Sequence, residues 1–143
     1  MLDESVRLKC QKLADNDSQG LRNIYPEFLD TNDIDLGRQK YSEVCKIFIH
    51  TNPSSLKFVV HDRLPNGVHD YVSMCEDLIS KSFYNLEYVE LDKLLNQKAL
   101  YKELCKMCKY DKQKELNLFK SIIRVDWLPN GEEDVLRLLN GDN

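Results

Sequence analysis

Two stretches of this chain carry the same four residues, LPNG, in the same setting. The first reads HDRLPNGVHDYV from His61, and the second reads RVDWLPNGEEDV from Arg124. In both, one aspartate stands two residues before LPNG and another stands three residues after it. A chain that contains the same turn twice is expected to be built from a repeated unit, which limits the folds open to it.

A second match lies upstream of each LPNG. The segments 41–47 (YSEVCKI) and 101–107 (YKELCKM) share the pattern Tyr-x-Glu-apolar-Cys-Lys-apolar. Two matches in the same order predict an internal duplication with a period near 60 residues. We expect a single domain, 1–143, with two units at about 5–66 and 70–130 and a C-terminal capping helix over 131–140.

Helical periodicity indicates that the units are all-α. In LYKELCKMCKY, four residues share one face at helical spacing: Leu100, Leu104, Met107 and Cys108. YSEVCKIFIH repeats this pattern. The segment NGEEDVLRLLNG adds end signals, because Asn130 can cap a helix, Glu133 can close a capping box and Gly141 can stop the helix.

The segments before LPNG are less clear. SSLKFVVHD on its own reads as a strand, because it is rich in β-branched and aromatic residues. Its counterpart, KELNLFKSIIRVDW, places Leu116, Phe119, Ile123 and Trp127 at helical spacing. The duplication favours one structure for both, so we predict helices, with a hairpin turning at PNG as the alternative for the first copy.

Helix signatures also recur at a shorter interval. Motifs of the type acid-apolar-apolar begin at Glu43, Asp70, Glu103 and Asp134, in steps of 27, 33 and 31 residues. Such steps are typical of stacked helix pairs. The predicted fold is therefore an internally duplicated helical repeat, an α-solenoid-like stack of helix pairs.

Three segments resemble ankyrin repeats. GEEDVLRLLNG (131–141) is similar to the second helix of that repeat, as is SEVCKIFIHTN, and SSLKFVV is similar to the first helix. The resemblance implies a divergent ankyrin-like or other α-solenoid stack. Members of such families usually bind other proteins.

Composition places the chain among ordinary globular proteins. Hydrophobic residues make up 42 % and charged residues 31 %. No apolar run is long enough to span a bilayer, and the first residues lack the pattern of a signal peptide. Five cysteines without an export signal are expected to be reduced thiols, which predicts an intracellular protein, cytoplasmic or nuclear.

The cysteines and histidines offer weak candidates for chemistry. A zinc site at Cys105-x-x-Cys108 would need two further ligands at matching spacing. The duplication aligns Cys108 with Phe48 and Cys75 with Leu139, so these are expected to be packing positions. His61-Asp62 and His69-Asp70 resemble base–orienter pairs, but the second unit has no histidine at either place. We predict no enzyme, no metal and no cofactor.

Charge is unevenly distributed along the chain. Residues 1–35 hold four basic and eight acidic side chains, whereas residues 93–120 hold eight lysines and three acids. Four of these lysines form a stripe on one predicted helix face: Lys98, Lys102, Lys106 and Lys109. The stripe suits an acidic protein partner or, as the alternative function, a nucleic acid, on whose bases Tyr101 and Tyr110 could stack.

The leading prediction is a protein-binding adaptor or inhibitor module that acts through a helical-repeat surface. Loops at one edge of such a stack often bind, and Trp and Arg are common at interface hot spots. We therefore predict partner binding by the residues at the two LPNG turns, with the lysine stripe setting orientation: Arg63, Leu64, Trp127 and Leu128. Exposed end faces of a short array also make a homodimer plausible.

Overall fold

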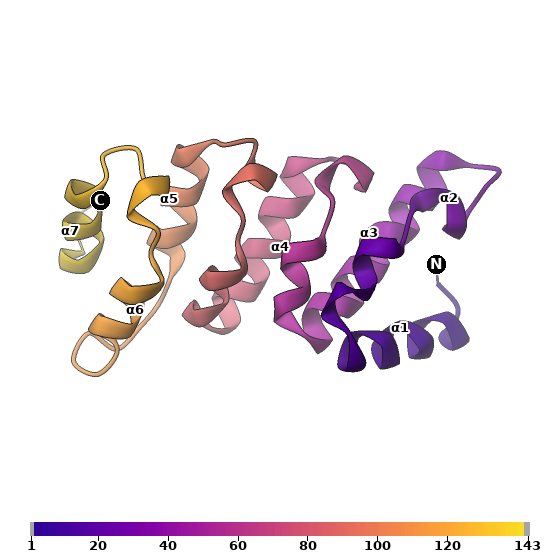
Figure 1. Ribbon diagram of the computed structural model, residues 1–143, viewed down its shortest axis with the longest axis horizontal. Helices are drawn as coiled ribbons and strands as arrows, with labels where there is room; N and C mark the ends of the chain where they lie inside the picture. The colour runs from indigo at the N-terminus through magenta and orange to yellow at the C-terminus, as the bar shows by residue number, and fades with distance from the viewer. Residues whose placement is uncertain (1, 142–143) are drawn as a thin grey trace. The chain divides into compact units, whose positions relative to one another are not determined.

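The computed structural model describes residues 2–141, without the side chain of Ser18, and this part of the chain contains helices but no strand (Figure 1). The α-helices are α1 (Glu4–Asn16), α2 (Pro26–Leu29), α3 (Ile34–Thr51), α4 (Val68–Lys81), α5 (Lys98–Met107), α6 (Leu116–Ile122) and α7 (Glu132–Asn140). The 3-10 helices are η1 (Ser18–Asn23), η2 (Pro53–Phe58), η3 (His61–Arg63), η4 (Phe83–Tyr88), η5 (Leu91–Leu94) and η6 (Val125–Trp127). The predicted all-α class is confirmed. None of these helices is both long enough and apolar enough to cross a membrane.

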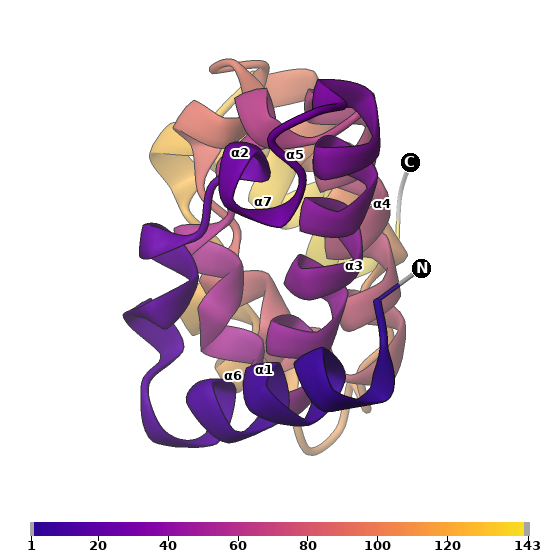
Figure 2. The ribbon, with the colours of Figure 1, turned by 90° about the vertical axis from the view of Figure 1, so that its right-hand side faces the viewer.

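The chain divides into two compact units, Met1–Met74 and Cys75–Asn143, with the division inside α4. In the first unit, α3 contacts α1, α2 and η2, and η1 packs on η2 (Figure 2). Gly37 lets α2 approach α3 closely, because a Cβ at Gly37 would lie 2.5 Å from the carbonyl oxygen of Pro26. Arg7 of α1 pairs with Glu43 of α3.

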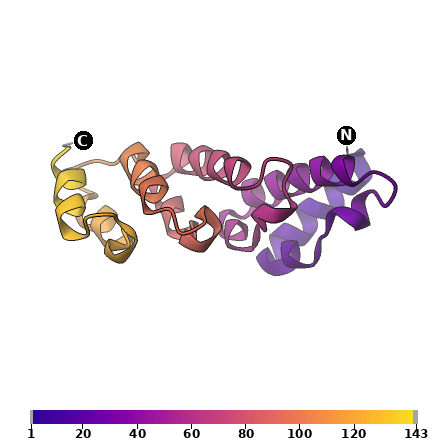
Figure 3. The same cartoon turned by 90° about the horizontal axis from the view of Figure 1, so that it is seen from above.

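In the second unit, α5 contacts η5, η6 and α7, while α6 contacts η4 and α7 (Figure 3). Aromatic rings fill the space around α6. Phe119 stacks on Tyr110 with ring centroids 4.3 Å apart and meets Phe83 edge-on at 6.0 Å. Phe83 and Phe119 are buried, so they form part of the core of this unit.

Three 3-10 helices begin in the same way. The side chains of Asp17, Asn52 and Ser82 each accept a hydrogen bond from the backbone N–H two residues on, at the start of η1, η2 and η4. A leucine at the same place in each helix is then fully buried: Leu21, Leu56 and Leu86. Each cap satisfies a backbone donor that the helix leaves unpaired.

Buried tyrosines tie α3 and α5 to the extended residues that follow in each unit. The Tyr41 hydroxyl accepts a hydrogen bond from Val60 N–H at 3.1 Å, and the Tyr101 hydroxyl accepts one from Arg124 N–H at 2.9 Å. Tyr71 is also fully buried, so three buried tyrosines stand 30 residues apart, at 41, 71 and 101.

This burial changes the expected register of the second helix. The acid-apolar motif aligned Asp70 with Glu43 and Glu103, but the buried positions align Tyr71 with Tyr41 and Tyr101, which puts Ser73 opposite the two glutamates. The buried tyrosines thus recur in even steps of 30 residues, whereas the acidic motifs of these helices recur in steps of 27 and 33. Asp70 also differs from the two glutamates in its partner, because it binds Asn66 of the LPNG turn, whereas Glu43 pairs with Arg7 and Glu103 pairs with Lys106.

The segments before LPNG are helical only in part. Residues 53–58 form η2, and Val59 and Val60 are then extended; the alternative hairpin at PNG does not occur among the described residues. The second copy is helical in α6, which ends at Ile122, so the expectation of one helix through Trp127 is wrong. The tyrosine hydroxyls explain the break, because they bind N–H groups that a continuing helix would use itself.

We expect Tyr101→Phe to destabilise the protein by about 1–3 kcal/mol, because Arg124 N–H loses its acceptor. Urea unfolding followed by tryptophan fluorescence suits this test, since Trp127 is the only tryptophan and packs edge-on against Tyr101. Tyr84→Phe is the matched control, because the Tyr84 side chain is 42 % exposed. Equal, small losses in the two variants would contradict the role given to the buried hydroxyl.

Candidate functional site

The two LPNG turns have the same backbone structure. Gly67 and Gly131 both have φ of +54°, a conformation that favours glycine. Their N–H groups donate to the carbonyl oxygens of Leu64 and Leu128, at 3.3 Å in each turn. Both leucines point inward and are only 1 % and 2 % exposed. The prediction that they contact a partner at loop tips is therefore wrong, because each leucine anchors its turn to the core below.

An aspartate fixes each turn from the helix that follows. Asp70 accepts hydrogen bonds from Asn66 N–H at 2.9 Å and from its side-chain amide at 3.2 Å. Asp134 does the same for Asn130, at 2.8 and 3.5 Å. The aspartate three residues after LPNG therefore holds the turn in both units. Its presence at the same place in both copies of the sequence was the signal for this role.

The expected cap of α7 is therefore wrong. Asn130 does not cap the helix with its side chain, and the first residue before α7 is Gly131, which makes no side-chain cap. Glu133, expected to close a capping box, instead pairs with Arg137 at 3.0 Å. Asp134 takes over the backbone donor that a capping box would have bound.

Asp134 also holds a lysine of the predicted stripe. Its side chain is fully buried, and Lys102 Nζ lies 3.1 Å from its Oδ1. Burial acts to raise the pKa of Asp134, but the hydrogen bonds from Asn130 and the charge of Lys102 outweigh it, so the pKa is lowered. Lys102 is thus part of the fold and is not a free surface charge.

The other stripe lysines differ in their partners. Lys106 pairs with the exposed Glu103 at 3.2 Å, whereas Lys98 and Lys109 have no ion pair among residues 2–141. Exposed pairs of this kind contribute little energy. The stripe therefore offers three lysines to an anionic partner: Lys98, Lys106 and Lys109.

Arg63 and Trp127 occupy equivalent positions, each one residue before a buried leucine, but their side chains make different contacts. Arg63 Nη1 donates to the carbonyl oxygen of Ile24 at 3.0 Å, and its guanidinium lies 3.7 Å from the centre of the Tyr25 ring. Trp127 is half-buried and packs edge-on against Tyr101 at 5.4 Å. Arg63 organises a surface, while Trp127 covers part of the core.

The surface that Arg63 organises was not foreseen from the sequence. Tyr25 is 39 % exposed and Phe28 is 75 % exposed, and their rings meet edge-to-face at 5.4 Å. Phe28 lies on the four-residue helix α2, which packs on α3. We call Tyr25, Phe28 and Arg63 the aromatic surface. An exposed apolar residue in a short helix carries no periodic signal, so the position of Phe28 cannot be predicted from the sequence pattern.

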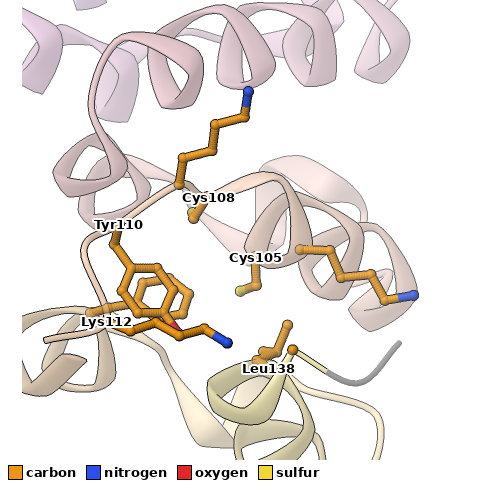
Figure 4. A pocket seen from close by; sticks show the side chains of 9 residues that line it. Cys105, Cys108, Tyr110, Lys112 and Leu138 are labelled. Atoms are coloured by element: carbon orange, nitrogen blue, oxygen red, sulfur yellow. The ribbon is translucent and has the colours of Figure 1, made fainter. Parts of the chain in front are cut away.

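The second unit has a hollow of about 360 Å³ beside the end of α5 (Figure 4). Lys106, Lys109 and Lys112 line it together with Tyr110, Phe119 and the thiols of Cys105 and Cys108. Figure 4 shows the side chains of Tyr110, Lys112 and Leu138 at this hollow, and Lys112 Nζ would lie 3.2 Å from a Cβ placed on Gly141. The Tyr110 hydroxyl is buried and has no hydrogen-bond partner among the described residues.

The five cysteines are all buried free thiols within the described chain. Burial raises the pKa of Cys105, and it raises that of Cys108 to about 12, so both are protonated and weakly nucleophilic at neutral pH. The Cys105 thiol is also hydrogen-bonded to Tyr101. Cys105-x-x-Cys108 is thus not a disulfide, and residues 2–141 contain no group of three or more ligands that could hold a metal.

The two predicted histidine–aspartate pairs have different contacts. His61 lies 3.1 Å from Asp62, on a 3-10 helix. His69 is exposed, and Asp70, its expected partner, binds Asn66 instead.

We expect Asp134→Asn to destabilise the protein by about 1–3 kcal/mol at pH 7. The folded-state pKa of Asp134 is below its unfolded value of about 4, so the ionised carboxylate stabilises the fold above that pH. The difference between wild type and variant should therefore shrink as the pH falls below about 4. Urea unfolding at several pH values measures it.

Asp70→Asn is the matched control for this variant. Asp70 makes the same two bonds to its asparagine, but among the described residues it has no lysine partner. We expect a smaller loss at pH 7. An equal loss in the two variants would show that the turn alone, without Lys102, accounts for the effect.

The native thiols should react slowly with Ellman's reagent at pH 8, since they are buried and protonated, and all five should react after unfolding in guanidinium. Fast reaction of one native thiol, traced by peptide mapping to Cys105 or Cys108, would contradict this and point to redox chemistry.

The chain matches no protein-family model, and searches of curated proteins and of solved structures found no significant match.

Proposed function

We propose that this chain is an internally duplicated helical-repeat protein that binds another protein and catalyses no reaction. Several recurring details support the duplication: the two LPNG turns with their aspartates, the buried tyrosines at 41, 71 and 101, and the capped 3-10 helices η1, η2 and η4. The resemblance of 131–141 to the second ankyrin helix agrees with such an array. Proteins of this kind usually work as adaptors or inhibitors, and free thiols suit an intracellular setting.

The aromatic surface is the observation that carries this proposal. Phe28 exposes 75 % of its surface to solvent, which is a cost in water for so large an apolar ring. The ring has one aromatic neighbour, because Tyr25 meets it at 5.4 Å, and the Arg63 guanidinium in turn lies 3.7 Å from the centre of the Tyr25 ring. An exposed aromatic group beside an arginine is the type of residue set that dominates binding energy at interfaces.

The charged residues near the aromatic surface indicate the chemistry expected of its partner. Exposed acidic residues lie close by in the sequence, on and after α2: Glu27, Asp33 and Asp35. A partner should therefore offer an apolar pocket for Phe28 with basic groups at its rim.

Nucleic-acid binding is the second candidate. It is favoured by Lys98 and Lys109, which have no ion pair among the described residues. Against it, Lys102 is held by Asp134, and Tyr101, expected to stack on bases, is fully buried. Binding of a protein at the aromatic surface does not require Lys102 or Tyr101 to be accessible.

The test replaces Phe28 by a photo-crosslinking phenylalanine and identifies what it captures in lysate from its own cells, with and without nuclease. We expect one discrete protein that survives nuclease. Its capture by affinity-tagged protein should fall about tenfold in Phe28→Ala and in Arg63→Ala.

Leu136→Ala is the matched control, because Leu136 is 54 % exposed on α7 in the other unit. Circular dichroism checks that each variant is folded. Equal capture by Phe28→Ala and wild type would rule out the aromatic surface. Loss of every partner on nuclease treatment would favour the nucleic-acid alternative.

A further inference from the structure

Two hollows of the second unit adjoin each other at the end of α5. The first, of about 360 Å³, lies toward α6 and α7, and the second, of about 430 Å³, lies toward the end of α4 and the start of η4. Lys106 and Lys109 line both. These two lysines therefore form a ridge with a hollow on either side.

The charges of both linings are all positive. Lys112 joins the ridge in the first hollow and Lys81 joins it in the second, and neither lining contains an aspartate or a glutamate. Lys109 and Lys112 have no ion pair among residues 2–141, Lys106 pairs only with the exposed Glu103, and Lys81 pairs with Asp77 at 3.7 Å. The thiols of the first hollow add no negative charge, because burial keeps them protonated at neutral pH.

Apolar side chains line part of each hollow. In the first, Phe119 and Tyr110 stack at 4.3 Å beside Leu138. In the second, Met107 is 39 % exposed and adjoins Phe83. Each hollow has the size of one or two side chains, so each fits an apolar residue while the ridge fits the acidic residues between them.

We propose that this double hollow binds a short acidic peptide segment of another protein, with acidic residues on the lysine ridge and an apolar side chain in each hollow. Charge complementarity selects the acidic segment. The Tyr110 hydroxyl, which is buried without a hydrogen-bond partner among the described residues and lines the same hollow as Lys112, supplies a further donor to an anion.

A peptide fits better than a nucleic acid. One face of Tyr110 is already covered by Phe119, which leaves less of the ring for stacking on a base. The two hollows are separate pockets that each contain apolar side chains, whereas a strand of nucleic acid needs a continuous basic groove.

This site needs none of the residues of the aromatic surface, and it belongs to the other compact unit. The two proposals are therefore tested by different variants. Loss of binding by Phe28→Ala concerns the first proposal alone.

The experiment selects peptides from a random 12-residue phage library on the purified full chain, with counter-selection on a Lys106→Glu/Lys109→Glu variant. We expect enriched sequences with acidic residues between two apolar ones. Fluorescence anisotropy of a labelled selected peptide should show affinity reduced about tenfold or more in Lys109→Glu and in Lys112→Glu. Lys120→Glu is the matched control, because this exposed lysine of the same unit lines neither hollow.

Thermal unfolding of every variant confirms that it is folded, and Met107→Ser tests the second hollow without a change of charge. Selection of no peptide, or of peptides that bind the Lys109→Glu and Lys120→Glu variants equally, would overturn the proposal. So would tighter binding of a 12-nucleotide oligothymidine, with steep weakening by salt, because that would assign the ridge to nucleic acid.

Discussion

The rest of the fold depends on a hydrogen bond from backbone N–H to a buried tyrosine hydroxyl. Val60 and Arg124 lie in extended backbone that has no strand beside it in the described chain, so nothing in regular secondary structure satisfies their N–H groups. Tyr41 and Tyr101 supply the acceptors from helices 19 and 23 residues earlier. A buried donor without an acceptor is costly, so this bond decides where the helix stops and where the chain turns.

In each unit, the LPNG turn comes a few residues after this hydrogen bond. The leucine is drawn into the core, the glycine adopts a positive φ, and an aspartate from the next helix binds the asparagine backbone. The same turn then presents different residues in the two units. Arg63 reaches across to Ile24 and Tyr25 and so orders an aromatic surface, whereas Trp127 folds onto Tyr101. The same turn thus supports an exposed aromatic surface in one unit and core packing in the other.

Much of the fold was readable from local pattern. Helical spacing predicted helices where α5 and α7 lie, and Gly141 does end α7 with a positive φ. Comparison of the two copies predicted buried packing cysteines, because Phe48 and Leu139 stand in for Cys108 and Cys75. The sequence pattern singled out Arg63, but not Tyr25, whose ring it covers, nor Phe28, which meets Tyr25. The leucines of LPNG were placed on the wrong side, because a turn motif does not show which of its side chains faces the core.

The sequence by itself determined the features that arise from neighbouring residues: helical faces, the glycine turns, the repeated aspartates and the separation of acidic and basic segments. Only the tertiary structure decided which charges are free and which rings are exposed. Lys102 is bound because Asp134 folds against it, and Tyr25 is clamped because Arg63, 39 residues from Ile24, donates to that carbonyl. The physical reason is that burial and pairing depend on contacts between residues distant in the chain, whereas periodicity and turn chemistry record only what adjacent residues prefer.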